Sequence, residues 1–412
     1  MDRIAKAGNS GPKVRSDCEI TLELRDSGGV TIDLKSKVKA LYGDSILSQC
    51  RQILEYFSIG NALVTIIDSG ALPFVISARM EAVIKKLTGS TKDFLPEQVN
   101  DTDFSTAKDR FRFSRLYLPG NNPSLMINAG LHSADGLIFD LEDSVAPDRK
   151  YEARLLVRNA LRQIDFCGSE RMVRINQGDT GLEDLKVVIP QNVNLILLPK
   201  CENGDQVKRV DKEIESLRKK YKLKNPVWLM PILESAAGIE NSYEIATSSE
   251  NVVAMAIGLE DYTADIGVQR TRLGHESLYA RTRLVNAAKA ARIQPIDSVF
   301  SDVSDMEGLR ANVSESRSLG FEGMGCIHPR QVPVIKEGFT PSDQEIEKAK
   351  KIVLAFEDAA RQGLGVVALG SKMIDKPVVD RAIKMLDLAG KIGVLDSNWR
   401  TIMQSDENKT NL

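Results

Sequence analysis

The stretch Gly136-Leu-Ile-Phe-Asp-Leu-Glu-Asp143 joins a short apolar segment to a cluster of carboxylates. Similar apolar segments recur along the chain, and each of the first seven is followed by a stretch typical of a helix. They lie at residues 116–118, 136–139, 171–175, 194–198, 227–233, 252–257, 298–301 and 323–327. Strands that alternate with helices predict a parallel sheet, and eight repeats predict an α/β fold of the (β/α)8 TIM-barrel type.

Polar residues follow these predicted strands at their carboxyl ends, where TIM barrels carry their chemistry. The residues are Pro119-Gly120, Glu142-Asp143, Arg174, Lys200, Glu234, Asp261, Asp302 and His328. An acid-rich ring that also holds a few cations predicts a site for a metal ion and an anionic substrate.

The composition argues against several classes of partner. The chain has 412 residues, enough for two or three domains, and its net charge of −2 gives no support for nucleic acid or an anionic membrane as partner. Its five cysteines include no CxxC pair, which favours a reducing, cytoplasmic location over a disulfide framework or a zinc site. Residues 1–15 lack the apolar core of a secretory signal, and no apolar run is long enough to span a membrane.

A small α+β domain is predicted for residues 1–90. Apolar and polar residues alternate at 18–24 and again at 30–34, on either side of the turn signal Asp26-Ser-Gly-Gly29. This pattern predicts a β-hairpin.

The rest of this domain is expected to hold two helices and a second hairpin. An amphipathic helix is predicted at 44–58 with Asp44 as its N-cap. The second hairpin would pair residues 62–67 with 72–76, and a short helix at 79–87 would close the domain.

Three further regions follow the small domain. Residues 91–111 are polar and lack periodicity, which is typical of a linker, and the barrel domain is predicted at 112–338. A helical unit at 339–395 begins with a helix at 343–361 and contains several glycines, which favours a movable lid. The last residues, 396–412, form a polar tail.

Motifs in a fixed order cover residues 112–395. They are Leu118-Pro-Gly-Asn-Asn-Pro123, Phe139-Asp-Leu-Glu-Asp-Ser-Val145, Val173-Arg-Ile-Asn176, Leu198-Pro-Lys200, Pro231-Ile-Leu-Glu-Ser-Ala236, Gly258-Leu-Glu-Asp-Tyr262, Thr271-Arg272, Ile327-His-Pro-Arg330 and Lys372-Met-Ile-Asp-Lys-Pro377. Together they resemble the citrate lyase β-subunit family of the HpcH/HpaI aldolase superfamily, which also holds malyl-CoA and citramalyl-CoA lyases. The resemblance implies a carbon–carbon lyase that uses Mg²⁺, and it does not select one substrate.

The amino-terminal domain resembles the citrate lyase γ-subunit, an acyl carrier protein, through segments such as Ala7-Gly8, Ser16-Asp17, Asn61–Val64 and Asp68–Leu72. That family attaches a phosphoribosyl-dephospho-CoA prosthetic group to a serine two residues before an Asp. If Asp17 is that Asp, the serine position holds Arg15. Either Ser16 has taken the role or the domain is structural.

The reaction implied by the resemblance is retro-Claisen cleavage of a 3-hydroxyacyl thioester. The substrate hydroxyl must lose its proton, the product enolate must be held, and the neighbouring carboxylate must be neutralised. Mg²⁺ bound to the hydroxyl and the carboxylate meets two of these demands. The resemblance implies Glu234 and Asp261 as the metal ligands. Glu260 competes with Asp261, because strand alternation would place only one of the two in the barrel.

Arg174 lies in an otherwise apolar strand, where a guanidinium suits a carboxylate or enolate oxygen, and Glu142 or Asp143 could pair with it. Glu142 is expected to organise waters on the metal or to orient Arg174. Four residues are candidates for the phosphates or carboxylates of a CoA-like group, or else are rim charges and structural hydrogen-bonding groups: Arg115, Lys200, Arg272 and His328.

Asp375 matches a lid residue that, in related malyl-CoA lyases, closes over the site of a neighbouring subunit and acts in proton transfer. The resemblance therefore implies a homotrimer or hexamer. The alternative role of Asp375 is to cap the helix that begins near Pro377.

Four functions remain open. The first is cleavage of a citryl thioester to oxaloacetate and an acetyl thioester, with a citrate lyase α-like transferase subunit as partner. The second is a stand-alone citramalyl-CoA or malyl-CoA lyase or thioesterase whose carrier domain is not loaded. A non-catalytic assembly scaffold is disfavoured by the presence of Arg174, Glu234 and Asp261, and an aldolase for free keto acids by Thr271-Arg272 and the lid motif.

Overall fold

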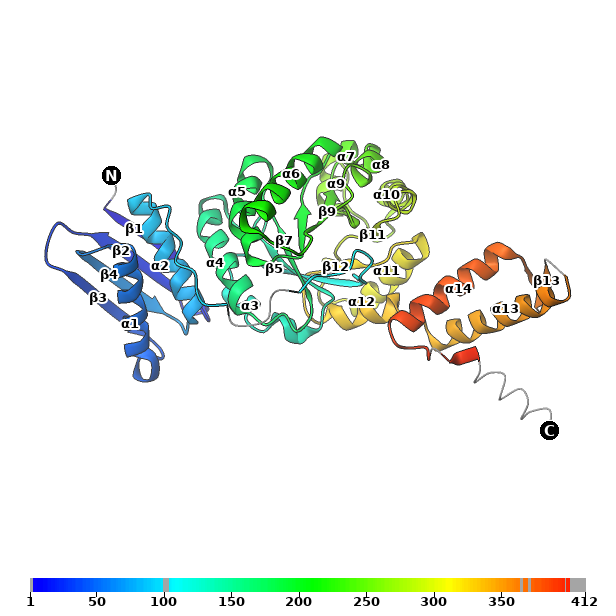
Figure 1. Cartoon of the computed structure of the whole chain (residues 1–412), viewed down its shortest axis with the longest axis horizontal. Coiled ribbons are helices and arrows are strands. Elements are labelled where there is room, and N and C mark those ends of the chain that lie inside the picture. The colour runs from blue at the N-terminus through cyan, green and yellow to red at the C-terminus, as the bar shows by residue number, and fades with distance from the viewer. Residues whose placement is uncertain (1–2, 99–103, 364–365, 370–371, 397, 401–412) are drawn as a thin grey trace. The chain divides into compact units, whose positions relative to one another are not determined.

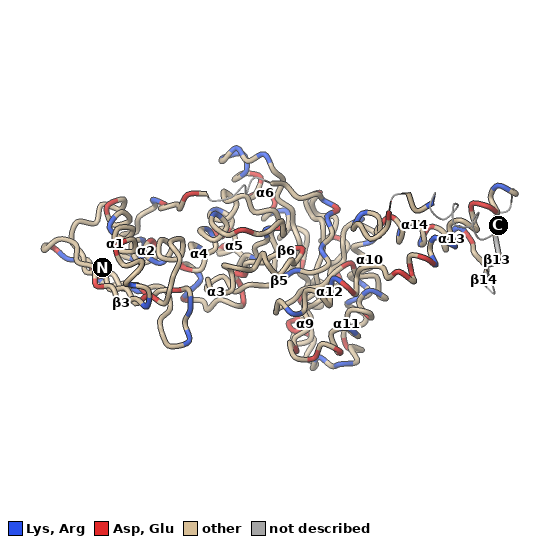
Figure 2. The backbone as a smooth tube through the Cα atoms, turned by 90° about the horizontal axis from the view of Figure 1, so that it is seen from below, with Lys and Arg blue, Asp and Glu red and all other residues tan. Residues whose placement is uncertain are grey.

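A computed structural model of the chain describes residues 3–98, 104–363, 366–369, 372–396 and 398–400. The chain divides into two compact units, residues 1–335 and 336–412. The first unit holds a small sheet domain and a barrel, and the second holds a helical hairpin (Figure 1). Lys and Arg are interspersed with Asp and Glu along the backbone of both units (Figure 2). Within the described ranges, no helix combines the length and the apolar character needed to cross a bilayer.

The barrel is a sheet of eight strands in the order β11-β10-β9-β8-β7-β6-β5-β12. The strands are β5 (Ser114–Pro119), β6 (Gly136–Asp140), β7 (Glu170–Arg174), β8 (Leu195–Leu198), β9 (Trp228–Leu233), β10 (Ala254–Ile257), β11 (Gln294–Ile296) and β12 (Met324–Cys326). Neighbouring strands run parallel, and a bridge between Asp297 and Met324 closes the sheet. The predicted TIM-barrel fold is confirmed.

Helices connect the strands around the outside of the barrel (Figure 1). They are α3 (Pro123–Met126), α4 (Lys150–Gln163), α5 (Gly178–Val188), α6 (Gly204–Tyr221), α7 (Ala236–Glu240), α8 (Ser242–Ala246), α9 (Leu259–Asp265), α10 (Leu278–Ala290), α11 (Met306–Leu319) and α12 (Gln331–Phe339). The inward faces of the strands form one apolar cluster that includes Ile138, Met172, Leu197, Met230 and Ile232.

The prediction of a seventh strand at 298–301 is wrong, because β11 occupies Gln294–Ile296 instead. Pro295 lacks an N–H, a feature that argues against a strand in the middle of a sheet. Here the amides of Gln294 and Asp297 donate to Val253 and Gly323, the residues just before β10 and β12, so the proline costs the ladder little. Residues 298–301 form the loop at the carboxyl end of β11.

The amino-terminal domain is a four-stranded sheet in the order β1-β2-β4-β3 with two helices. Its elements are β1 (Ile4–Gly8), β2 (Cys18–Leu24), β3 (Val30–Ser36), α1 (Lys39–Tyr56), β4 (Ala62–Asp68) and α2 (Pro73–Thr88). Strand β2 pairs antiparallel with β1 and β4, whereas β3 pairs parallel with β4.

Both predicted hairpins of this domain are wrong. Strand β4 lies between β2 and β3, because its buried Ala62, Val64 and Ile66 suit a central strand, while β3 buries only Leu34 and forms an edge. The segment 72–76 begins helix α2, whose first residue is Pro73. Its apolar run does not alternate, because the helix is buried on nearly all sides.

Two smaller corrections concern helix starts. Helix α1 begins at Lys39 with Val38 as its N-cap, so Asp44 is an interior residue and not a cap. After β5, where the sequence predicts a helix, the chain forms the short α3 and a 3-10 turn at Ala129–His132.

Helix α2 lies between its own sheet and helix α4 of the barrel (Figure 1). Buried ion pairs join the two: Glu81 accepts two bonds from Arg158, at 2.6 and 2.9 Å. Arg79 holds the buried Asp17 at 3.0 and 3.1 Å and lies 3.7 Å from Glu152. Breaking a buried pair leaves an uncompensated charge, so these contacts fix the small domain on the barrel.

The second unit consists of α13 (Asp343–Arg361) and α14 (Lys376–Lys391), joined by the antiparallel strands β13 (Val367–Leu369) and β14 (Lys372–Ile374). The helices pack on each other through a cluster that includes Ile346, Val353, Val379, Ala382 and Leu386. Residues 364–365 and 370–371 of the predicted glycine-rich segment lie outside the described residues.

Candidate active site at the carboxyl ends of the barrel strands

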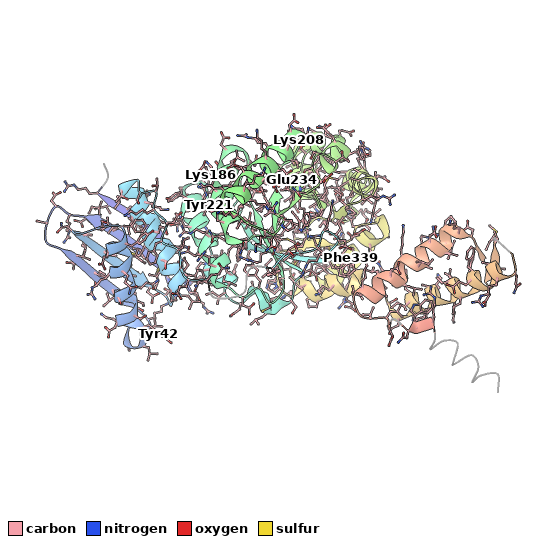
Figure 3. All side chains as sticks on the ribbon, viewed as in Figure 1. Tyr42, Lys186, Lys208, Tyr221, Glu234 and Phe339 are labelled. Atoms are coloured by element: carbon pink, nitrogen blue, oxygen red, sulfur yellow. The ribbon has the colours of Figure 1, made fainter. Side chains whose placement is uncertain are left out.

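A cavity of about 300 Å³ lies at the carboxyl ends of the barrel strands. Glu234 lies inside the ring of barrel helices, whereas Lys186 and Lys208 lie on its outer surface (Figure 3). The polar side chains that line the cavity include Arg115, Asp140, Arg174, Glu234, Glu260 and Asp261.

Arg174 is the last residue of β7 and is held by an acidic cluster. Its Nε and Nη2 donate to the two carboxylate oxygens of Asp140 at 2.6 and 2.7 Å, and its Nη1 lies 3.2 Å from Glu142 and 3.7 Å from Asp143. The guanidinium lies over the ring of Tyr117. Burial alone would lower the pKa of Arg174, but Asp140 raises it above its usual value. The bidentate partner is thus Asp140, although the sequence pointed to Glu142 or Asp143.

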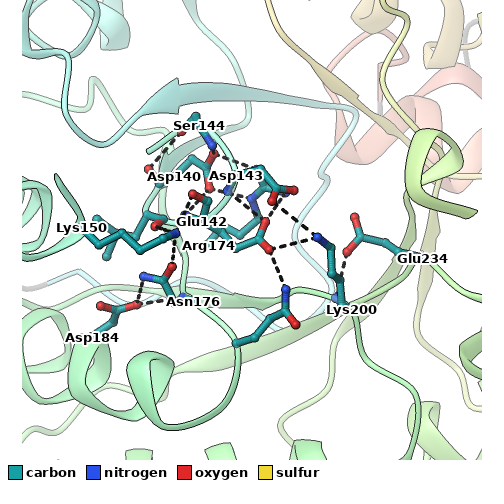
Figure 4. Close-up of polar contacts among 12 residues, drawn as sticks. Asp140, Glu142, Asp143, Ser144, Lys150, Arg174, Asn176, Asp184, Lys200 and Glu234 are labelled. Atoms are coloured by element: carbon teal, nitrogen blue, oxygen red, sulfur yellow. Dashed lines mark hydrogen bonds and ion pairs between the residues drawn. The ribbon is translucent and has the colours of Figure 1, made fainter. Parts of the chain in front are cut away.

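The loop that follows β6 is held by a half-buried lysine, Lys150, and two side-chain amides (Figure 4). Nζ of Lys150 donates to the carbonyls of Leu141 and Glu142, at 3.1 and 2.9 Å, and also to Asn176. Gln177 donates to the Glu142 carboxylate at 3.0 Å. Burial raises the pKa of Glu142. This arrangement places Glu142 at Arg174, as predicted from the sequence.

Lys200 joins the acids of three strands. Its Nζ lies 3.5 Å from Glu142, 3.5 Å from Asp143 and 3.6 Å from Asp261. Burial lowers the pKa of Lys200, but these carboxylates raise it overall. The backbone φ of Lys200 is +47°, an uncommon conformation for a residue other than glycine, and its N–H donates to Glu234 at 2.8 Å.

Glu234 directly follows β9 and is only 6% exposed. Burial raises the pKa of Glu234 to about 7, while the amide of Lys200 and the charge of Arg174 lower it. A Cβ at Gly258 would lie 2.4 Å from Oε1 of Glu234, so the glycine provides the space in which the carboxylate lies. A buried carboxylate with few partners is a site that a cation stabilises.

Asp261 and Glu260 both line the cavity, but they have different partners. Both lie in the first turn of α9, so the prediction that strand alternation separates them is wrong. Helical spacing separates them instead, since Glu260 pairs with Arg270 at 2.7 Å while Asp261 approaches Lys200. Among the described residues, no three His, Cys, Asp or Glu side chains gather as a metal site. Two carboxylates nevertheless fit Mg²⁺, which keeps water and substrate oxygens as its other ligands.

Arg115 lies deeper in the barrel than the acids. It is 1% exposed, and its Nη1 contacts the Met230 sulfur at 2.9 Å. Burial lowers the pKa of Arg115 to about 10, so it remains charged at neutral pH. Its Nε has no hydrogen-bond partner among the described residues.

Of the four predicted substrate-binding residues, Arg115 lines the cavity, whereas Lys200, Arg272 and His328 are not among its lining residues. Arg272 is exposed on the loop between α9 and α10. His328 follows β12, and its Nδ1 accepts the N–H of Arg330 at 3.2 Å.

The remaining predicted residues lie in the flanking regions. Ser16 has a φ of +56°, and its N–H donates to Ser69 at 3.1 Å. Asp375 is the N-cap of α14, where its carboxylate accepts the N–H of Val378 at 3.4 Å.

Sequence reasoning missed several residues that build the site. Asp140 was part of the quoted motif but had no assigned role, although an acid at the end of a strand facing Arg174 on the next strand was a usable signal. Tyr117, Lys150 and Gln177 carry no spacing signal, because their contacts depend on the closed barrel. Gly258 could have been noted, since a glycine at a strand end often marks a close approach.

Two family models match the chain. The model described as HpcH/HpaI aldolase/citrate lyase matches residues 114–329, and the model described as malonate decarboxylase delta subunit (MdcD) matches residues 5–87. The first match covers the barrel strands and the second covers the amino-terminal sheet.

Curated proteins and solved structures agree with these matches. Citrate lyase subunit beta of Leuconostoc mesenteroides subsp. cremoris is 36% identical over 297 residues, which cover 71% of this chain and 98% of that protein. Mitochondrial citramalyl-CoA lyase of Homo sapiens is 32% identical and covers 67% of this chain and 85% of that protein. The structure of protein CitE from Mycobacterium tuberculosis in complex with magnesium, acetoacetate and coenzyme A aligns with a TM-score of 0.57 and 28% identity over 69% of this chain and 100% of that chain. On these matches the chain belongs to the HpcH/HpaI aldolase/citrate lyase family of lyases, with an MdcD-like acyl carrier domain at its amino terminus.

Proposed function

We propose that the chain cleaves the carbon–carbon bond of a citryl thioester by a magnesium-dependent retro-Claisen reaction, giving oxaloacetate and an acetyl thioester. The observation that carries the proposal is the buried Glu234 carboxylate beside Asp261, in a cavity that also holds Arg174. The CitE structure in complex with magnesium, acetoacetate and coenzyme A supports it, because it shows which ligands a relative with this fold binds.

Glu234 and Asp261 are the residues that would hold Mg²⁺, as their oxygen donors suit a hard cation. When bound, the ion supplies a Lewis acid that lowers the pKa of the substrate hydroxyl and neutralises the adjacent carboxylate. Lys200 positions both ligands, since its backbone N–H orients Glu234 and its ammonium lies near Asp261.

Arg174 is assigned to the substrate carboxylate or the enolate oxygen. Asp140 binds its Nε and Nη2, which fixes the plane of the guanidinium, and the substrate would share Nη1 with Glu142, which lies 3.2 Å away. As the carbon–carbon bond breaks, the hydroxyl proton departs and the bonding electrons pass to the thioester enolate. A fixed donor stabilises that charge without reorganisation. We assign Asp375 to proton transfer from the lid of a neighbouring subunit in a homotrimer or hexamer.

The experiment is a cleavage assay on the full-length protein with citryl-CoA and citramalyl-CoA, in Mg²⁺ and in chelator. Formation of oxaloacetate that requires Mg²⁺ is the expected result. Absence of cleavage of both thioesters in Mg²⁺ would overturn the proposal.

A stand-alone lyase on citramalyl-CoA or malyl-CoA is the second candidate. The observation that favours it is Arg15, which occupies the position expected for the carrier serine. Intact mass of the protein from its native host separates the two. A mass increase of one CoA-derived arm at Ser16 supports the citryl thioester on a loaded carrier, together with a transferase partner. An unmodified chain that cleaves free citramalyl-CoA supports the second candidate.

A further inference from the structure

Arg115 is a charged side chain in a place that normally excludes charge. It lies near the start of β5 inside the barrel, next to Met230, which belongs to the apolar cluster of the lumen. Within the described part of the chain, no carboxylate lies within ion-pair distance of Arg115, and its Nε makes no hydrogen bond. A buried charge without a partner costs several kcal/mol, on the order of the effective penalty known for single buried ions.

The cavity at the carboxyl ends of the strands extends down to Arg115. The residues that pair with Arg115 in register are glycines, Gly136 on β6 and Gly325 on β12, and the space at these glycines is taken by Met172 and by Val299 and Tyr117. Arg115 and Gly325 both line the cavity that also contains Glu234 and Asp261. An anion at Arg115 would therefore share one cavity with the proposed metal site.

We propose that Arg115 binds a second carboxylate on the oxo-acid portion of the substrate and so selects citryl thioesters over citramalyl thioesters. The inference rests on the proposed function. A citryl group carries a carboxymethyl arm where a citramalyl group carries a methyl. Arg174 and the metal ion bind the carboxylate next to the reacting hydroxyl, and Arg115 binds the carboxylate of the carboxymethyl arm. A short carboxylate arm fits a cavity of about 300 Å³.

The order of the residues along β5 supports this division. Tyr117 lies two residues closer to the carboxyl end than Arg115 and carries Arg174 on its ring. The two guanidiniums thus lie at two depths, Arg174 at the strand ends and Arg115 below it. A 2-hydroxy acid with carboxylates at both ends can contact both cations, and a monocarboxylate leaves the deeper one without a partner.

The test compares kcat/KM for citryl-CoA and citramalyl-CoA in the full-length protein and in Arg115→Met. Methionine keeps a long apolar stem and removes the charge, so the variant should be at least as stable as the parent. The expected result is a fall in the citryl to citramalyl ratio of roughly 10- to 100-fold, since removing a charged partner commonly costs a few kcal/mol. Arg115→Lys, which keeps the charge, should retain part of the preference.

Binding gives a second readout that is independent of turnover. Calorimetric titrations in Mg²⁺ with malate and lactate compare two 2-hydroxy acids that differ in the second carboxylate. Arg115→Met should weaken malate and leave lactate nearly unchanged. If the parent and Arg115→Met have the same ratio of kcat/KM for citryl-CoA to that for citramalyl-CoA, the role of Arg115 is overturned and the proposed function stands. If the parent cleaves neither thioester, the role of Arg115 and the proposed function are both overturned. If Arg115→Met does not fold, Arg115→Gln, which also removes the charge, carries the same comparison.

Discussion

At the scale of single residues, the candidate site depends on how buried charges are paired. Glu234 lies in a pocket where burial raises its pKa, and Gly258 provides the room for its carboxylate. Arg174 has the opposite environment, since Asp140 binds it with two hydrogen bonds. The Glu234 carboxylate is thus suited to bind a cation, whereas the Arg174 guanidinium is held in a fixed orientation.

Glu234→Gln should abolish magnesium-dependent cleavage without unfolding the chain. The amide cannot supply the anionic oxygen that Mg²⁺ needs, and loss of such a group commonly costs at least about 10²–10³ in rate. Steady-state kinetics in a series of Mg²⁺ concentrations measures the loss. Glu260→Gln is the matched control, because Glu260 pairs with Arg270 and should not be needed. Full activity in Glu234→Gln would refute the metal assignment.

The same variant should change how stability depends on pH in the metal-free protein. The pKa of Glu234 is about 7 in the fold against a usual 4.5, so the folded state binds its proton more tightly than the unfolded state does. Its contribution to stability is present below pH 4.5 and is lost as pH rises through 7, by about 3 kcal/mol in all. In chelator-treated samples, the free energy of unfolding of Glu234→Gln should therefore fall less between pH 4.5 and pH 7 than that of the parent. Urea denaturation at a series of pH values measures this difference.

Gly258→Ala should lower the rate of cleavage by displacing the Glu234 carboxylate. An added Cβ would lie 2.4 Å from Oε1 of Glu234 and 2.7 Å from its Cγ, so the carboxylate must move. A shift of about 1 Å at a reacting centre can cost roughly 10²-fold in rate. Gly60→Ala, where no atom lies within 4 Å of the added carbon, is the control for a glycine change of ordinary cost. Equal kcat values for the two variants would show that the close approach is not needed.

The sequence predicted part of the site. Five residues named from the sequence, Arg174, Glu142, Glu234, Asp261 and Lys200, lie close together, because residues at the carboxyl ends of parallel strands converge at one end of a barrel. Their pairings could not be read from the chain. They depend on which side chain each closed strand presents, and on details such as the positive φ of Lys200.

At the scale of elements, the helix that follows Asp375 gives the lid motif two possible roles. The carboxylate caps α14, which is worth about 1 kcal/mol by itself. Asp375→Ser separates the roles, since serine is also a good N-cap but carries no carboxylate. We expect thermal stability close to the parent and a large loss of kcat. A variant with parental kcat would restrict Asp375 to capping.

The packing of α2 on α4 depends on one ion pair in particular. Glu81→Ala removes the buried carboxylate that binds Arg158, which is 2% exposed, and leaves it with the exposed Asp93 at 3.2 Å, so the variant should destabilise the chain by up to about 3–5 kcal/mol. Urea denaturation measures the change. Glu183→Ala is the matched control, because its pair with Lys186 is exposed and contributes at most about 1 kcal/mol. Equal midpoints for the two variants would contradict a stabilising role for the buried pair.

Helices and strands were predicted correctly where the spacing of apolar residues was clear. The prediction failed where tertiary packing, and not local spacing, decided the structure. The helix at 343–361 was predicted to the residue, and seven barrel strands were located from apolar runs. The hairpin of 18–24 with 30–34 failed because local alternation cannot tell which strand becomes central. Strand β11 was not predicted, because Pro295 lies in it and proline is unusual in the middle of a sheet.

At the scale of the whole molecule, the chain combines an MdcD-like domain with a lyase barrel. If the lid of one subunit serves the site of another, two inactive variants should complement each other. Glu234→Gln and Asp375→Ser, mixed during refolding, would form oligomers in which an intact site meets an intact lid. We expect each variant alone to be inactive and the mixture to regain part of the parental rate. A mixture without activity would indicate that each lid serves its own chain.

The amino-terminal domain packs on the barrel of the same chain, so a prosthetic arm on this domain would be present once for each barrel. The Arg79–Asp17 pair lies beside Ser16, and Arg79 also donates to the Asn121 carbonyl just beyond the carboxyl end of β5. An arm attached at Ser16 would therefore start at the end of the barrel where the cavity lies. A free carrier protein reaches its enzyme at whatever concentration the cell maintains, and it can visit many copies. Here the fold itself would set the effective concentration of the arm, with one arm for each barrel and no exchange between molecules.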